Sequence, residues 1–389
     1  MPRTKVARRK RRFEALESRL CMAAEVKLLE GGLLAIAGDA TGAIDITISD
    51  VAGVQTVVVA EAGVEPPASF PLADVSGGVR IRLTGDGAGA NDTVNMNLGG
   101  QTLDSVFADL GRGDNSFALA NGTIAKTLTV RGGDGNDSVS IAADAAVNGL
   151  FTALLGNGTN SVDILGHTGS VVIRGGSGDD TVTLGDDAVV ARLAASLGPG
   201  GNTFNSAGDI TGGAVIDGGS GSDRIAISGN TGGLVAALGG GTNDVAISGK
   251  ASGPVIVNTR DGNDTVTLAE GAEIGGQFIT NLGGGDNSLT LAGHVSRGVT
   301  YNGLGGNDVV SIGGTGSIGG QVIAQLGGGN NSLTQAGLIA GNLVVFSTNA
   351  ADADRIVTKD GTVNGQTLIR VGRPKLRDLF DQIFHAIFG

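Results

Sequence analysis

Six aspartates recur at a regular spacing, and their carboxylates are the side chains in this sequence best suited to chemistry. They are Asp92, Asp137, Asp180, Asp223, Asp264 and Asp308. Six asparagines in the same local frame alternate with them: Asn115, Asn160, Asn202, Asn243, Asn287 and Asn331. Successive members of the combined series are 20 to 23 residues apart. We call each of these twelve positions a key residue. Carboxylate and amide oxygens are hard ligands of the kind that Ca²⁺ takes in proteins.

The segments around three key residues have the form Gly-Gly-x-Gly-x-Asp-x-apolar-x. They are Gly132–Ser140, Gly175–Thr183 and Gly218–Ala226. This pattern resembles the calcium-binding nonapeptide of repeats-in-toxin proteins, in which aspartates and turn carbonyls of neighbouring coils hold Ca²⁺. The resemblance implies Ca²⁺ at the six aspartates, with Asp137, Asp180 and Asp223 as the best candidates. This chain departs from that family, because its nonapeptides are separated and every second one carries asparagine.

A second interpretation of the same residues needs no metal. Aspartate and asparagine side chains readily bond to their own turns, and identical positions in stacked coils form ladders. Asparagines placed between aspartates reduce the repulsion between carboxylates in either case. The sequence therefore predicts calcium sites or a metal-free ladder, and it leaves both open.

The residues after each key position predict the element that carries it. Two positions on, the side chain is apolar in every copy, as in Val139, Val162 and Val182, and polar residues alternate with these apolar ones. Such alternation is typical of a strand with one buried face. A second short strand precedes each turn, at 128–130, 171–173, 255–257, 278–279 and 322–323, and a glycine-containing bend links the two strands.

One such unit of about 22 residues cannot bury its own apolar face, so the units must stack. We expect an all-β protein, a single-stranded parallel β-solenoid of 12 to 14 right-handed coils. The stacked coils should form a rod about 60 Å long. The repeats occupy residues 85–371, and residues 26–84 are expected to hold degenerate coils with a proline-rich loop. Residues 372–389 have helical apolar spacing, which predicts an amphipathic helix that caps the last coil.

The composition restricts the possible partners. Residues 1–25 contain eight basic and three acidic residues, which leaves 18 basic and 35 acidic residues, a net charge of −17, over residues 26–389. A body this acidic repels nucleic acid and favours cations. No apolar run is long enough for a transmembrane helix, and the single cysteine, Cys21, excludes an intrachain disulfide.

The first 25 residues are expected to be a basic export leader. After a basic run they contain Phe13, Glu14, Leu16, Glu17, Arg19 and Leu20. This spacing resembles the F-E-x-L-E-x-R-x-L leader of exported planctomycete proteins. The resemblance implies an extracellular or cell-surface protein whose leader is removed. A basic tail that binds nucleic acid is the alternative, and the acidic body argues against it.

Two other functional classes compete with a structural role. A carbohydrate-active β-helix enzyme would need paired carboxylates or a cationic base in a groove, with aromatic platforms. The chain has no Trp and one Tyr, and Arg131, Arg174, Lys250 and Arg260 form no common motif. An ice-binding array would need unbroken Thr-x-Thr pairs, but only Thr181/Thr183 and Thr265/Thr267 fit. We therefore expect a non-enzymatic structural or adhesive surface module, stabilised by Ca²⁺ if the aspartates bind it, with surface polymers or surface proteins as partners.

Overall fold

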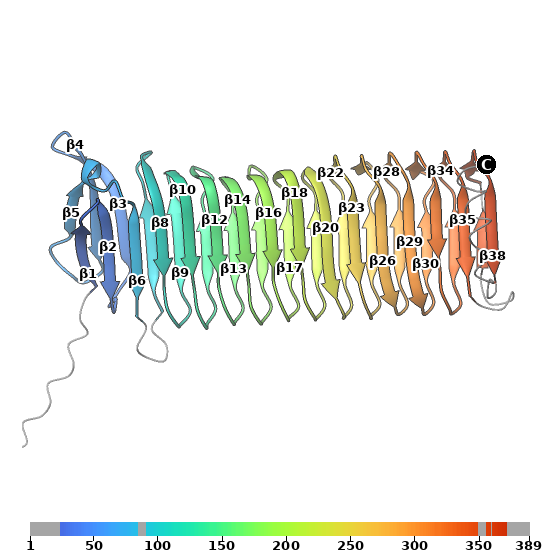
Figure 1. Ribbon diagram of the computed structural model, residues 1–389, viewed down its shortest axis with the longest axis horizontal. Coiled ribbons are helices and arrows are strands. Elements are labelled where there is room, and N and C mark those ends of the chain that lie inside the picture. The colour runs from blue at the N-terminus through green and yellow to red at the C-terminus, as the bar shows by residue number, and fades with distance from the viewer. Residues whose placement is uncertain (1–23, 85–90, 349–354, 359, 372–389) are drawn as a thin grey trace, which may run out of the picture.

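The computed structural model describes residues 24–84, 91–348, 355–358 and 360–371, which form one straight rod (Figure 1). The described residues contain β-strands and one short 3-10 helix, Leu72–Asp74. The strands form two long sheets of 22 and 16 strands, here called sheet A and sheet B. The expected all-β parallel solenoid is confirmed, because coil-to-coil pairing along both sheets is parallel.

Sheet B is built from the strands that follow the key residues. Its parallel strands are β3 (Ile44–Val51), β7 (Thr93–Asn97), β9 (Ser116–Ala120), β11 (Ser138–Ile141), β13 (Ser161–Ile164), β15 (Thr181–Leu184), β17 (Thr203–Ser206), β19 (Arg224–Ile227), β21 (Asp244–Ile247), β24 (Thr265–Leu268), β27 (Ser288–Leu291), β30 (Val309–Ile312), β33 (Ser332–Gln335) and β36 (Arg355–Thr358). The predicted apolar row is in register, since Val182 pairs with Val162 and Phe204, and all three side chains are buried.

Sheet A completes each coil, first with long strands and later with two shorter ones. The long strands are β2 (Leu33–Gly38), β6 (Val79–Leu83), β8 (Thr102–Asp109), β10 (Gly122–Arg131), β12 (Ala145–Leu154), β14 (His167–Arg174), β16 (Val189–Ser196), β18 (Asp209–Asp217) and β20 (Thr231–Gly239). The later strands are β22 (Lys250–Ala251), β23 (Val255–Thr259), β25 (Glu273–Ile274), β26 (Phe278–Gly284), β28 (His294–Val295), β29 (Val299–Gly305), β31 (Ser317–Ile318), β32 (Val322–Gln325), β34 (Leu338–Ile339), β35 (Leu343–Ser347), β37 (Thr362–Val363) and β38 (Thr367–Val371).

The later coils differ from the sequence prediction in one respect. The bend that was expected to link two strands itself contains a short third strand, such as β25, which pairs with β22 and β28. The buried Ile274 in this strand continues the row of inward side chains that the long strands of sheet A carry in the earlier coils. Two of the 16 strands of sheet B, β4 and β5, form an antiparallel extension, and the other 14 define 14 coils within the described residues, in the expected range.

The N-terminal end contains antiparallel strands that the sequence did not predict. β2 and β3 form one coil, but β1 (Glu25–Leu29) pairs antiparallel with β2, and β4 (Val54–Glu61) and β5 (Ala68–Pro71) extend sheet B from β3. Only part of residues 26–84 is therefore degenerate coil. These strands cover the edge of the first coil, whose backbone groups would otherwise be open to pairing.

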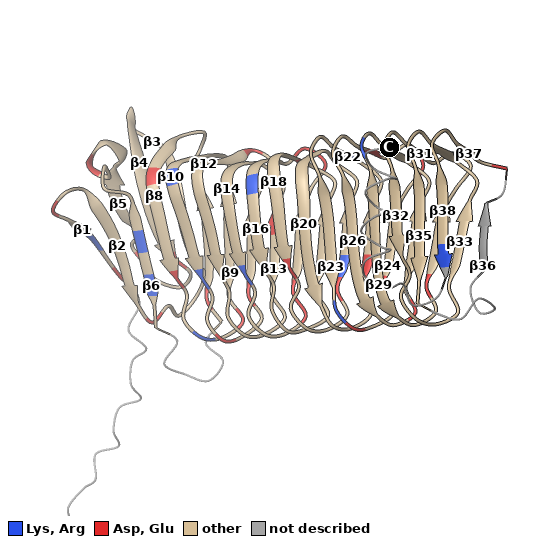
Figure 2. Ribbon diagram, turned by 45° about the vertical axis from the view of Figure 1, so that its right-hand side comes forward, with Lys and Arg blue, Asp and Glu red and all other residues tan. Residues whose placement is uncertain are grey.

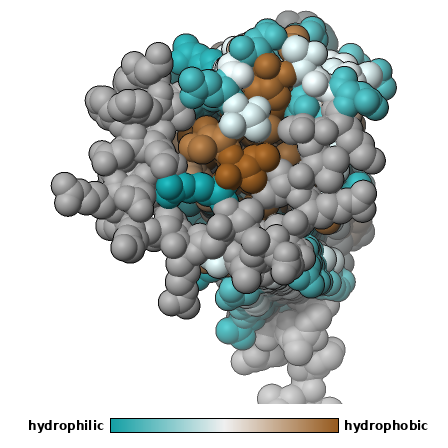
Figure 3. Space-filling model, turned by 90° about the vertical axis from the view of Figure 1, so that its right-hand side faces the viewer, coloured by the Kyte–Doolittle hydropathy of each residue, from teal (hydrophilic) through white to brown (hydrophobic). Residues whose placement is uncertain are grey.

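The two terminal predictions fall mostly outside the described residues. The leader, 1–25, overlaps them only at Ala24 and Glu25, and Glu25 already belongs to β1. The capping helix, 372–389, lies wholly outside them. Apolar side chains gather at the centre of the C-terminal end of the rod (Figure 3). Ile369 there is 40% exposed, although its partner Val345 is fully buried.

Candidate functional site: the inner Asp–Asn ladder

The six candidate aspartates lie inside the rod, where the glycine turn from sheet A enters sheet B. Asp92, Asp137, Asp180, Asp223, Asp264 and Asp308 are between 0% and 4% exposed. The six alternating asparagines are equally buried. Each key residue directly precedes a strand of sheet B, as Asp137 precedes β11. The apolar residue two positions on anchors that strand in the core and thereby fixes the side chain of the key residue on the inner side of the turn.

The key residues form one continuous hydrogen-bonded row, which we call the inner ladder. The Oδ1 atom of each key residue from Asn115 to Asn331 accepts the backbone N–H of the key residue one coil earlier. The N–O distances in these eleven bonds lie between 2.9 and 3.1 Å. These bonds form a ladder of stacked aspartates and asparagines, and each bond ties one coil to the next.

The asparagines also use their Nδ2 groups. Asn202 Nδ2 donates to the carbonyls of Gly198 and Gly200 in its own turn, to Gly218 O in the next coil, and to Asp223 Oδ1. Asn160 makes the equivalent four contacts. A buried amide with both atoms bonded stabilises the turn and the stacking together, because no polar atom is left without a partner.

The aspartates differ from the asparagines at their second side-chain atom. Oδ2 of all six aspartates is buried and accepts no hydrogen bond. For five of the aspartates the structure describes the residue five positions earlier, and in four of these coils it is glycine: Gly132, Gly175, Gly218 and Gly303. A Cβ at any of these glycines would overlap the Oδ2 atom of the following aspartate. These glycines are therefore needed for space, and the carboxyl occupies the volume of the missing side chain.

Every asparagine coil has leucine at the equivalent place, five residues before the key residue. These leucines are Leu110, Leu155, Leu197, Leu238, Leu282 and Leu326, and all are buried. Aspartate thus occurs with a small residue and asparagine with leucine. This alternation is visible in the sequence and was missed there, although it distinguishes the two kinds of coil.

Burial shifts the acidity of the ladder. Desolvation raises the pKa of Asp92 and Asp137 to about 6, and hydrogen bonds from Asn115 to Asp137 only partly oppose this. Desolvation likewise raises the pKa of Asp180, Asp223 and Asp308, against the hydrogen bonds that each accepts from the preceding asparagine. A carboxyl in this environment favours its neutral form.

The oxygen atoms of the inner ladder do not match the coordination sphere of Ca²⁺. Ca²⁺ takes six to eight oxygen ligands, but consecutive aspartates are two coils apart, about 10 Å at the spacing of parallel strands. Asn Nδ2 donors lie between them, and no three acidic or histidine side chains converge within the described residues. Calcium binding at Asp92, Asp137, Asp180, Asp223, Asp264 and Asp308 stays a prediction.

Gly175→Ala tests the space that the aspartate needs. The added Cβ would overlap Asp180 Oδ2, so we expect a loss of about 1 to 3 kcal/mol in the free energy of unfolding. Gly240→Ala is the matched control, because its Cβ would meet only Asp261 O at 3.6 Å. Urea unfolding followed by circular dichroism measures both variants. Equal stability of the two would contradict the packing described here.

One groove outside the core brings acidic residues together, but without the spacing of a glycosidase pair. Asp and Glu residues lie mainly along the loop edges of the rod (Figure 2). A shallow groove is lined by Asp209, Lys250 and Glu273, but Lys250 pairs with Glu273 at 3.0 Å and Asp209 accepts the N–H of Asn230. Asp209 and Glu273 are three coils apart, about 14 Å, which exceeds the roughly 5 to 9.5 Å between catalytic carboxyls.

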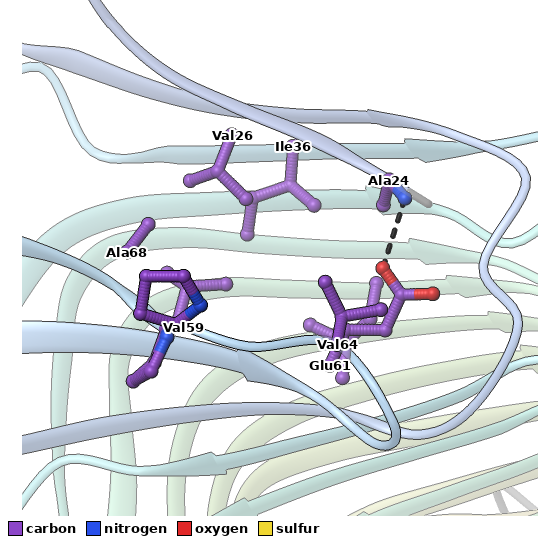
Figure 4. A pocket seen from close by; sticks show the side chains of 10 residues that line it. Ala24, Val26, Ile36, Val59, Glu61, Val64 and Ala68 are labelled. Carbon is purple, nitrogen blue, oxygen red and sulfur yellow. Dashed lines mark hydrogen bonds between the residues drawn. The ribbon is translucent and has the colours of Figure 1, made fainter. Parts of the chain in front are cut away.

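A pocket of about 210 Å³ lies near the N-terminal end, and the polar contacts of its carboxylate hold the fold together (Figure 4). Its one carboxylate, Glu61, accepts the Ala24 N–H at 2.9 Å and both the N–H and the hydroxyl of Thr41, at 2.6 and 2.7 Å. The remaining lining is largely apolar, with Val26, Ile36 and Val59 among its residues. Glu61 thus ties the antiparallel strands to the first coil.

The other singled-out residues lie on outer surfaces. His167 and His294 are exposed, each at the first position of a strand of sheet A. The threonine pairs do not extend along sheet B, because Thr181 and Thr183 pair with Ser161 and Asp163 on one side. Arg131 and Arg174 form no common motif in the sequence, but in the structure both line one shallow hollow of about 580 Å³. Arg112, Asp109 and Asp134 line the same hollow. The pairing of alternate coils brings these arginines to one face.

Comparison with known proteins gives a likeness in architecture. No family model matches the chain, and no curated protein matches it. Among solved structures, the chain is similar to a hyperactive, Ca²⁺-dependent, β-helical antifreeze protein from an Antarctic bacterium, with 18% identity and a TM-score of 0.41. The match covers 79% of this chain and 89% of that one. A similarity of this degree supports no functional argument.

Proposed function

We propose that the chain is an exported structural module, a stiff rod that spaces or attaches components at the cell surface or in the extracellular matrix. The observation that supports this is the continuous inner ladder, which ties consecutive coils from Asp92 to Asn331. A ladder of this kind makes bending costly, because each coil is bonded to both neighbours. No helix in the described ranges is long and apolar enough to cross a bilayer.

The partner we propose is an anionic surface polymer, bound at the arginine-lined hollow. Arg131 lies over the ring of Phe107 at 5.2 Å, which holds its side chain in place. Guanidinium groups bind carboxylates through paired hydrogen bonds. Arg112 and Arg174 present two further guanidinium groups in the same hollow of an otherwise acidic rod.

Cell fractionation tests the export proposal. The chain should be recovered outside the cytoplasm, and mass spectrometry should find a mature N-terminus that lacks the basic head and Cys21. Recovery of an intact, Cys21-containing chain from the cytosol would overturn export. Release of reducing sugar from a panel of polysaccharides would instead support the competing enzyme.

The polymer proposal is tested by Arg131→Ala combined with Arg174→Ala. We expect binding to polygalacturonate, measured by co-sedimentation, to fall at least tenfold. Arg192→Ala is the control, because this exposed arginine of β16 lies outside the hollow. Equal loss in the control would indicate that only net charge matters, and this would contradict a defined site.

A further inference from the structure

The carbonyls that face the inner ladder fall into two sets. Three of the ladder asparagines donate a hydrogen bond from Nδ2 to a carbonyl of the next coil. This carbonyl belongs to the residue five positions before the key residue of that next coil. These bonds are Asn115 to Gly132 at 3.2 Å, Asn160 to Gly175 at 3.1 Å and Asn202 to Gly218 at 2.8 Å. In the coil after an aspartate this carbonyl belongs to a leucine. Leu155 O and Leu197 O receive no hydrogen bond from the described residues.

One coil shows which group these leucine carbonyls can accept. Before Asp264 the position five residues earlier is threonine, not glycine, and Thr259 Oγ1 donates to Leu282 O at 2.9 Å. Leu282 is the leucine of the following asparagine coil. A hydroxyl from the preceding coil therefore fits this carbonyl, and in the glycine-containing coils Asp Oδ2 lies where the side chain of this residue would be.

In the coil of Asp180, the carboxyl group and a leucine carbonyl lie next to the same glycine. Asp180 Oδ2 lies against Gly175, and Leu197 O is 2.8 Å from the point where a Gly175 Cβ would be. The carboxyl oxygen and the carbonyl oxygen thus face the same small space. Leu155 and Leu197 bound it from the neighbouring coils. Two oxygens without a hydrogen between them would repel each other in this apolar surrounding.

We propose that the ladder aspartates of the glycine-containing coils are neutral carboxylic acids in the stable rod, with Oδ2–H donating to the leucine carbonyl of the next coil. The proton takes the place of the asparagine amide hydrogen, so that both kinds of coil donate to the same position. The ladder is then a row of proton-binding sites two coils apart, and it makes the rod sensitive to pH.

The groups around these sites oppose ionisation. Asp39 acts on Asp92, Asp114 on Asp137, Asp179 on Asp180, Asp217 on Asp223, and Asp286 on Asp308. Each is an acid that disfavours a second charge. The Tyr301 hydroxyl next to Asp308 is the one donor side chain besides asparagine. Arg131 and Arg174 lie outside on sheet A, and none of the ion pairs among the described residues includes a ladder aspartate.

The sign of the pH effect follows from the pKa shifts. The pKa of Asp137 is raised from 3.8 to about 6 in the folded rod. Between these values the folded chain binds more protons than the unfolded chain, so the free energy of unfolding falls as pH rises. The stabilisation is complete below about pH 4 and is lost as pH increases through about 6.

Thermal unfolding of the full chain between pH 4 and pH 8 tests the proposal, with Asp180→Asn as the variant. We expect the wild-type midpoint to fall with rising pH. Asp180→Asn should lie close to wild type at pH 4 and above it at pH 8, since the amide donates at every pH. The infrared band of protonated carboxyl groups should weaken in this variant at pH 5.

Asp163→Asn is the matched control. Asp163 lies on the outward side of β13, where it pairs with Ser140 and Thr183, and it is not among the acids that act on the ladder aspartates. The control should leave the pH dependence unchanged. A midpoint that rises with pH, or an Asp180→Asn variant that is less stable than wild type only when Ca²⁺ is present, would overturn the proposal. The second result would assign the carboxylate to calcium.

Discussion

Val182→Asp is expected to cost more than about 4 kcal/mol of the free energy of unfolding, because it buries an unpaired carboxylate in the apolar row. Val182 is 1% exposed and lies between Val162 and Phe204 of the adjacent coils. None of these side chains can donate a hydrogen bond. The coil that carries the charge must open locally or the stack must separate at that point. Urea unfolding and small-angle scattering, which reports the length of the rod, measure the two outcomes.

Thr181→Asp provides the comparison for this prediction. Thr181 is on the outward face of the same strand, between Ser161 and Thr203. A carboxylate there stays hydrated, so the expected change is below about 1 kcal/mol. Similar losses in both variants would mean that sheet B tolerates charge on its inner face, which contradicts a packed core.

Asn202→Ala is expected to cost about 3 kcal/mol or more, because one truncation leaves several buried groups without partners. The Asp180 N–H loses its acceptor, and Gly218 O and Asp223 Oδ1 lose a donor. These groups belong to the two coils on either side of Asn202, so the ladder is weakened in both directions. Hydrogen exchange should show faster exchange at the Asp180 N–H than in the wild-type chain.

Asn205→Ala is the appropriate control in the same coil. Asn205 lies on the outward side of β17, three residues after Asn202, and pairs with Thr183 and Ala226. Its loss should change the free energy of unfolding by less than about 0.5 kcal/mol. An equal effect at both positions would show that the ladder contributes no more than a surface asparagine.

Most of the fold could be predicted from the sequence, because it depends on a pattern that repeats. The apolar residue two positions after each key residue, as in Val139, specifies strand, buried face and register together. The antiparallel strands β1, β4 and β5 could not be predicted in this way, since they occur once and have no repeat to reveal them. The third short strand of the later coils was missed because its segment was interpreted as a bend, although its buried residue, such as Ile274, recurs in register from coil to coil.

The candidate site was predicted only in part. The spacing identified every member of the inner ladder, but it placed the carboxylates on an edge where a cation could reach them. Their burial depends on the residue five positions earlier, which is Gly175 for Asp180 and Leu197 for Asn202. Gly175 is the first glycine of the Gly-Gly-x-Gly-x-Asp motif, but the motif alone does not show that this glycine makes room for the carboxyl or that leucine replaces it in the asparagine coils.

Because aspartate coils and asparagine coils alternate, the rod keeps this order only when coils are added or removed in pairs. Aspartate coils follow one another at 41 to 45 residues, twice the length of a single coil. Removal of one coil, such as 181–202, would bring Asp180 next to Asp223, with two glycines where leucine should fill the space between them. Removal of 181–223 would instead join Asp180 to Asn243 and preserve the order. Duplication or loss during evolution, and any engineered extension, is therefore expected to proceed in pairs of coils.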